Sequence, residues 1–247
     1  MANATEHFFN NPKVQQVAIQ FGFRIPVRQE LNPGTKKSLQ NVLTDLSPEI
    51  FQMFNERPQG NTGCLFQSHR QLILGVQTIT FPAFALNADN VIFYHPIKIL
   101  GQQITKSDPI DASNKNQEIS SWFLEVQKVI KTAPCHRTGK IYELVLGPFL
   151  PSDKEQVFKE LLKINLDNIG EMAMTFANYV TQEEDTYNIQ TNLQYMQLKL
   201  DDQFGINVRV DINNRNLESS MEPNAIEKVW KFADKEIDNH LMGIFNI

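Results

Sequence analysis

The chain contains little cysteine and no spacing typical of a metal site. Only two of its 247 residues are cysteines, Cys64 and Cys135. Two thiols in a chain of this length do not make a disulfide framework, and no Cys or His spacing of a zinc site accompanies them. We therefore expect two free thiols, with no metal and no other cofactor.

Long apolar runs are also missing. No stretch approaches the roughly 20 residues that a membrane helix needs, and the amino terminus lacks the basic and apolar regions of a signal peptide. At 41% hydrophobic residues, the chain can still bury a substantial core. The sequence thus predicts a folded cytoplasmic protein that makes no membrane contact.

The charge balance lacks the excess of cations typical of nucleic-acid proteins. A net charge of -5 argues against affinity gained by neutralising phosphates. The densest basic group lies near the middle of the chain and comprises Lys128, Lys131, His136, Arg137 and Lys140. Nucleic-acid binding through Arg137 and Lys140 is therefore a hypothesis that ranks below the two given at the end of this section.

Catalytic motifs are absent as well. The sequence has no Gly-x-Ser-x-Gly elbow, no phosphate-binding glycine loop, no His-Glu-x-x-His helix and no dinucleotide fingerprint. Cys135 precedes His136, but adjacent side chains of an extended segment point apart, and no third group is available to orient them. We expect no catalytic residues and no enzymatic activity.

What the chain does contain is one order of elements, present twice: strand, helix, three strands, helix. In the first stretch, apolar residues alternate along 15–24 and predict a half-buried strand. Thr35 stands where a helix cap is expected, and Ser47 with Pro48 starts a second short helix.

Three strands and a long helix are expected to complete this first stretch. His69 and Arg70 are expected in a hairpin turn between the first two strands, and the polar residues 102–117 in a loop. The strands are expected over 63–67, 71–78 and 91–97. The helix is expected on the apolar stripe Ile119, Trp122, Phe123, Val126, Val129 and Ile130.

The second stretch, after Pro134, repeats this order. Ser152 and Glu155 predict a capping box at the start of a helix. Pro223 is expected to begin the last helix, whose apolar stripe continues for about six turns. The strands are expected over 140–146, 172–180, 187–195 and 206–212.

Together these elements predict an α+β fold. Two halves, 1–133 and 134–247, are expected to pack as one compact unit around a curved antiparallel sheet, with helices on one face and the other face partly open. This topology resembles the TATA-binding-protein-like and helix-grip folds.

Several segments resemble a sporadically distributed family of uncharacterised bacterial proteins of about this length. The resemblance implies no catalytic residue, and Arg137 to Gly139 is the nearest part to a signature. A patchy distribution implies accessory genes, and so a regulator in a bacterial defence or stress operon. The segments are VQQVAIQFGF, HRTGKIYELVLGPF, YNIQTNLQYMQ, FGINVRVDINNRN and EPNAIEKVWKFADKEIDNHLMGIFNI.

A row of uncharged amides is the most unusual local composition. Amides lose less than charges on desolvation, so such a row suits a surface covered by another protein. The alternative is a coding bias that fills solvent-facing positions with amides. Asn207, Arg209, Asp211 and Asn213 are its expected cross-strand neighbours. The predicted partner-binding residues are Asn188, Gln190, Asn192, Gln194, Arg209, Arg137 and Lys140.

The leading hypothesis is therefore a non-enzymatic protein that binds another protein. The second hypothesis is a ligand-binding or hydrolytic protein with a pocket between the sheet and the last helix. Four aromatic residues would line that pocket instead of filling the core: Phe176, Tyr195, Trp230 and Phe245.

Overall fold

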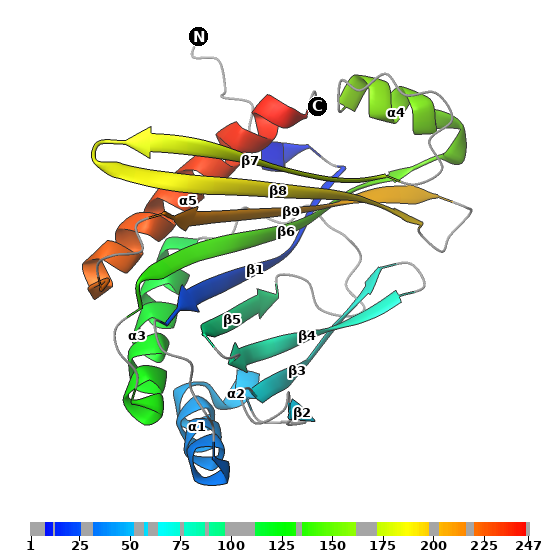
Figure 1. Cartoon of the computed structure of the whole chain (residues 1–247). Coiled ribbons are helices and arrows are strands. Elements are labelled where there is room, and N and C mark those ends of the chain that lie inside the picture. Colours follow the sequence, from blue (N-terminus) through cyan, green and yellow to red (C-terminus); the bar gives the residue numbers. More distant parts are fainter. Residues whose placement is uncertain are drawn as a thin grey trace.

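A computed structural model describes most of the chain and confirms the α+β class with an antiparallel sheet (Figure 1). The described residues are 8–11, 13–25, 32–51, 57–58, 64–74, 77–86, 89–96, 112–131, 135–161, 172–197, 203–215 and 220–245. Within them, nine strands form one sheet in the order β2-β3-β4-β5-β1-β6-β9-β8-β7.

The strands are β1 (Val14–Arg24), β2 (Arg57–Pro58), β3 (Cys64–Leu74), β4 (Gln77–Leu86), β5 (Asn90–Pro96), β6 (Arg137–Phe149), β7 (Ala173–Gln182), β8 (Asp185–Gln197) and β9 (Phe204–Asn214). The helices are α1 (Pro33–Leu46), α2 (Pro48–Phe51), α3 (Ala112–Ile130), α4 (Lys154–Leu161) and α5 (Pro223–Ile244), with short 3-10 turns η1 (Phe8–Asn10) and η3 (Pro151–Asp153).

The centre of the sheet is the antiparallel pair of β1 and β6. β5 lies on the other side of β1, and β9 lies on the other side of β6. The first strand of each predicted half therefore lies beside the last strand of that half. The division of the chain at residue 134 remains a prediction, and that boundary lies outside the described residues.

Helices α1, α3 and α5 lie on one side of the sheet (Figure 1). The Trp230 ring of α5 meets Phe21 and Phe23 of β1 edge-on, at centroid distances of 5.1 and 5.3 Å. Phe23 in turn stacks on Phe123 of α3 at 3.8 Å. These contacts make one aromatic core between sheet and helices. We call the other side of the sheet the open face.

The second hypothesis expects four aromatic residues to line a pocket, and the packing shows where each of them lies. Trp230 and Phe245 are fully buried in the core, while Phe176 and Tyr195 are partly buried and pack against it. The expectation that they line a cavity has no support in this packing, because the four rings contribute to the core itself. No described helix is long and apolar enough to cross a bilayer.

The first-half hairpin differs from its prediction. β3 is one strand through His69 and Arg70, so the turn expected there is wrong. Its pairing with β4 shifts register between Gln67 and Gln71, so an irregularity in the ladder accommodates the polar residues that interrupt the alternation. The side chains of His69 and Arg70 lie outside the described ones.

Helix starts also differ from their predictions. Asn32, not Thr35, caps α1, because its Oδ1 accepts a 2.8 Å hydrogen bond from the Thr35 backbone N–H. Ser152 bonds to its neighbour Asp153 inside a 3-10 turn, so the predicted capping box is wrong. Helix α3 begins at Ala112, so the end of the expected loop is helical.

Candidate functional site

Two glycines make a hollow in the open face. Gly22 of β1 lies directly opposite Gly139 of β6, and Asn213 of β9 lies opposite Gly139 on the other side. Because neither glycine has a side chain, the open face is recessed there into a hollow of about 200 Å³. We call it the glycine hollow; its lining includes Arg24, Asn90, Ile92, Arg137, Ile141, Asp211 and Asn213.

The two glycines are under different constraints. A Cβ at Gly139 would lie 2.6 Å from both the Asn213 Cβ and the Ile212 carbonyl oxygen, so strand spacing requires glycine there. A Cβ at Gly22 would meet only the Gly139 carbonyl oxygen, at 3.9 Å. A Cβ at Gly22 therefore points into the hollow without a close contact to the backbone.

Arg137 is oriented at this hollow by hydrogen bonds to Asn213. Its Nε and Nη2 donate to Asn213 Oδ1 at 3.1 and 2.5 Å, and Asn213 Nδ2 donates to Asp211 Oδ1 at 2.8 Å. Asn213 is only 4% exposed, so its amide has little freedom to move. Among the described residues, no hydrogen-bond partner is found for Arg137 Nη1.

The pKa values reflect this partial burial. Burial lowers the pKa of the Arg137 guanidinium, opposed by Asp211 and reinforced by nearby Arg24 and Arg215. Arginine nevertheless stays charged at physiological pH. Burial raises the pKa of the Asp211 carboxyl, although Asn213, Arg137 and Arg209 act in the opposite direction.

Further arginines lie near the hollow. Arg24 pairs with Asp89 at 3.2 Å, Arg209 lies 3.9 Å from Glu143, and Arg215 covers the Tyr179 ring at 4.3 Å. Together with Arg137 there are four cations in this region, and the carboxylates beside them are three: Asp89, Glu143 and Asp211. Among the described residues, these cationic groups near the glycine hollow therefore outnumber the carboxylates by one.

The predicted amide row extends from the glycine hollow along β8. Asn188, Gln190, Asn192 and Gln194 pair with Asn213, Asp211, Arg209 and Asn207 of β9 in that order. Three of the amides are half-buried and Gln194 is exposed. Because facing residues of paired strands share a side of the sheet, the amide row lies on the open face with Arg137 and Arg209.

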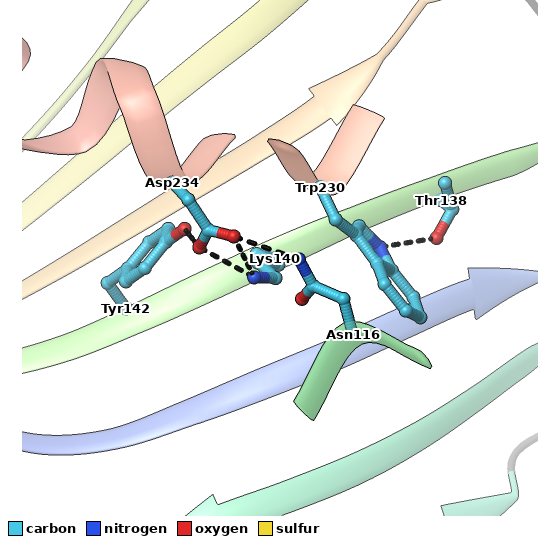
Figure 2. Close-up of polar contacts among 6 residues, drawn as sticks. All are labelled: Asn116, Thr138, Lys140, Tyr142, Trp230 and Asp234. Carbon is cyan, nitrogen blue, oxygen red and sulfur yellow. Dashed lines mark hydrogen bonds and ion pairs between the residues drawn. The ribbon is translucent and has the colours of Figure 1, made fainter. Parts of the chain in front are cut away.

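Lys140 does not belong to this surface, so its expected place beside Arg137 in a basic patch is wrong. Successive side chains of a strand point to opposite faces, which puts Lys140 on the helix side. It is 0% exposed, and its Nζ donates to both carboxylate oxygens of Asp234 at 2.6 and 2.7 Å (Figure 2).

The Lys140–Asp234 pair is the centre of a buried polar network. Tyr142 Oη and Asn116 Nδ2 also donate to Asp234, at 2.8 and 3.0 Å, which connects α3, α5 and β6 (Figure 2). Burial lowers the pKa of Lys140 to about 8 against the opposing effect of Asp234. Burial also raises the pKa of Tyr142 well above its ordinary value.

A second chain of hydrogen bonds connects the helix side to the floor of the glycine hollow. Trp230 Nε1 donates to Thr138 Oγ1 at 3.0 Å, and Thr138 Oγ1 donates to the Gly22 carbonyl at 2.8 Å. Helix α5 is thereby fixed to the strands that form the hollow. These contacts stabilise the site's backbone and leave its open side accessible.

Sequence reasoning missed the glycine hollow and the buried network, although each left a signal. Glycines interrupt two strongly patterned strands at Gly22 and Gly139. Asp234 follows Trp230 by one helical turn, which puts a carboxylate next to the apolar stripe. Asn116 lies in the polar stretch 102–117 that is expected as a loop, so for this one member of the network the sequence gives no indication.

Cys135 and His136 are the adjacent candidates for a nucleophile and its base. Burial raises the pKa of the Cys135 thiol to about 12, and burial with Arg24 and Arg137 lowers the pKa of His136. The thiol is therefore neutral, which weakens the case for a nucleophile. Within the described part of the chain, no group of three His, Cys, Asp or Glu residues is suited to hold a metal ion.

Comparison with known proteins adds no family. No protein-family model matches the chain, and no curated protein matches it.

Proposed function

We propose that this protein is a non-enzymatic cytoplasmic binding module that holds a segment of another protein on its open face. The observation that carries the proposal is that the glycine hollow and the amide row lie on the same side of the sheet, opposite helices α1, α3 and α5 (Figure 1). The buried free thiol of Cys135 is compatible with a reducing compartment.

The hollow has the size and chemistry for one side chain. Small-molecule sites measure about 300–1,000 Å³, whereas this hollow measures about 200 Å³. Arg137 offers a charged N–H group from a fixed position, which suits the carboxylate of a partner's Asp or Glu. The amide row then covers the flanking peptide, since amides lose less than charges when water is removed.

Nucleic acid fits this face less well than an acidic peptide does. The arginines are interleaved with Asp89, Glu143 and Asp211, and Lys140 is buried on the other side. A nucleic-acid backbone would bring phosphates against those carboxylates. A binding role without chemistry suits a regulator or companion of another gene product, as in a bacterial defence or stress operon.

The test is an affinity purification from host lysate with matched variants. Gly22→Val fills the glycine hollow, while Gly243→Val is the control, because a Cβ at Gly243 meets nothing within 4 Å. We expect one stoichiometric protein with wild type and Gly243→Val, reduced about tenfold or more with Gly22→Val, a change of about 1.4 kcal/mol in binding free energy.

Two further arms sharpen this experiment. Gln190→Glu with Gln194→Glu should weaken the same interaction at an unchanged melting temperature, since they add charge to the amide row. Loss of the partner on nuclease treatment would point to nucleic acid and contradict the proposal. Equal recovery with Gly22→Val and Gly243→Val would remove the glycine hollow from it.

A further inference from the structure

β7 is an edge strand without the usual protection. It is the outermost strand of the sheet, and no described residue pairs with its outer side (Figure 1). Its ten residues, AMTFANYVTQ, contain no charged side chain and no proline. Edge strands normally carry charges, prolines or bulges that prevent pairing with another chain.

The register with β8 shows which backbone groups point outward. Pairing is continuous from Ala173 to Gln182, and the Tyr195 N–H donates to the Met172 carbonyl at 2.9 Å. In an antiparallel ladder, alternate residues bond to the same neighbour. Even-numbered residues of β7 therefore bond to β8. The odd-numbered residues, from Ala173 to Thr181, direct their N–H and C=O groups to the outer edge.

We propose that β7 pairs in antiparallel register with β7 of a second copy of this chain, about a twofold axis at Ala177. Outward groups then pair with outward groups: Ala173 with Thr181, and Thr175 with Tyr179. A twofold axis at this central residue uses the whole edge, whereas an axis nearer either end would leave part of it unpaired.

The side chains of β7 are complementary to themselves in this register. Met174 of one copy lies opposite Val180 of the other on the helix side, and both already pack partly buried against the core. On the open face, Ala177 is small enough for close approach at the axis, and Tyr179, 60% exposed in one copy, lies beside Thr175. Within the described residues 173–181, no like charges face each other in this register, which favours a second copy over a charged partner strand.

The experiment is sedimentation of the full chain over about 1 µM to 1 mM, a range that covers weak and moderate dimers. We expect wild type to reach the mass of two chains. Ala177→Lys and Ala177→Asp should each stay at one chain, because like charges then meet at the axis. An equimolar mixture of the two variants should restore a dimer. Asn207→Lys, on the open face away from this edge, is the matched control and should dimerise like wild type.

A cysteine variant tests the register if the charged variants fail to fold. Hydrogen-bonded antiparallel pairs have Cα atoms about 5.5 Å apart, within the range of a disulfide. Ala177→Cys should therefore cross-link between copies under mild oxidation, and Asn207→Cys should not. A wild type that stays at one chain throughout, or an Ala177→Lys that still dimerises, would overturn the proposal.

Discussion

The two faces of strand β6 hold their cations in opposite ways. Lys140 points to the helices, is fully buried and donates to Asp234. Arg137 points to the open face, is half-buried and is oriented by Asn213. One strand thus carries a buried ion pair on its helix side and a half-buried cation on its open face. The direction of each side chain along the strand decides which role its charge has.

The largest expected effect comes from breaking the helix side. Asp234→Ala leaves the Lys140 ammonium buried without its carboxylate, so we expect a loss of about 3–5 kcal/mol in unfolding free energy, measured by urea denaturation. Asp234→Leu combined with Lys140→Met should recover most of it, because no buried charge remains. A loss below about 1 kcal/mol in the single variant would show that the pair is solvated.

The floor of the glycine hollow gives the next largest effect. Gly139→Ala forces a methyl group against the backbone of β9, and we expect a loss of about 1–3 kcal/mol, typical of an overpacked site. Gly22→Ala is the control, because its Cβ has room, and it should change stability by less than about 0.5 kcal/mol. Equal melting temperatures for the two variants would contradict this account of strand spacing.

Acid sensitivity tests another buried contact on the helix side. His240 of α5 shares a 2.7 Å hydrogen bond with Thr191 of β8, and burial lowers its pKa to about 4 from an ordinary value of 6.5. The unfolded chain therefore takes up a proton between these values while the folded chain does not. The stabilisation that comes from a neutral His240 is complete above pH 6.5. As the pH falls toward 4 it is lost, by at most about 1.4 kcal/mol of unfolding free energy per pH unit.

The measurement is the urea midpoint of wild type and His240→Gln across this pH range. The variant should show a shallower loss of stability, although not a flat one, because burial and nearby arginines also lower the pKa of His136. Identical slopes for the two proteins would indicate that His240 titrates normally when folded.

The smallest effect on stability is expected on the open face. Arg137→Gln removes a partly solvated cation and its bonds to Asn213, so we expect a change below about 1 kcal/mol by urea denaturation. Partner binding, measured by titration calorimetry, should fall by a larger factor than stability does. Unchanged binding would separate Arg137 from the proposed function.

The two edge strands of the sheet, β2 and β7, also differ from each other. β2, at one edge, has only two residues, Arg57 and Pro58, and a proline cannot donate to a further strand. β7, at the other edge, is long and uncharged. A short edge with proline resists pairing, and a long edge without charge favours it, which is why the proposed dimer uses β7.

Features that depend on local periodicity can be predicted from the residue pattern alone. The alternation along β8 and β9 was sufficient to place the amide row on one side, and the stripes of α3 and α5 identified their buried faces. These patterns repeat every two or 3.6 residues, so neighbouring residues are enough to detect them. The fold class follows from the same patterns.

Contacts between residues far apart in the chain follow from strand register and helix packing, which no local pattern reveals. The opposition of Gly22 and Gly139 depends on the register between strands far apart in the sequence, and the Lys140–Asp234 pair depends on how α5 packs on β6. The number of charges near residue 137 does not indicate that Arg137 and Lys140 lie on opposite faces of the sheet. Their separation follows from strand geometry, since residues an odd number of positions apart on a strand point to opposite faces.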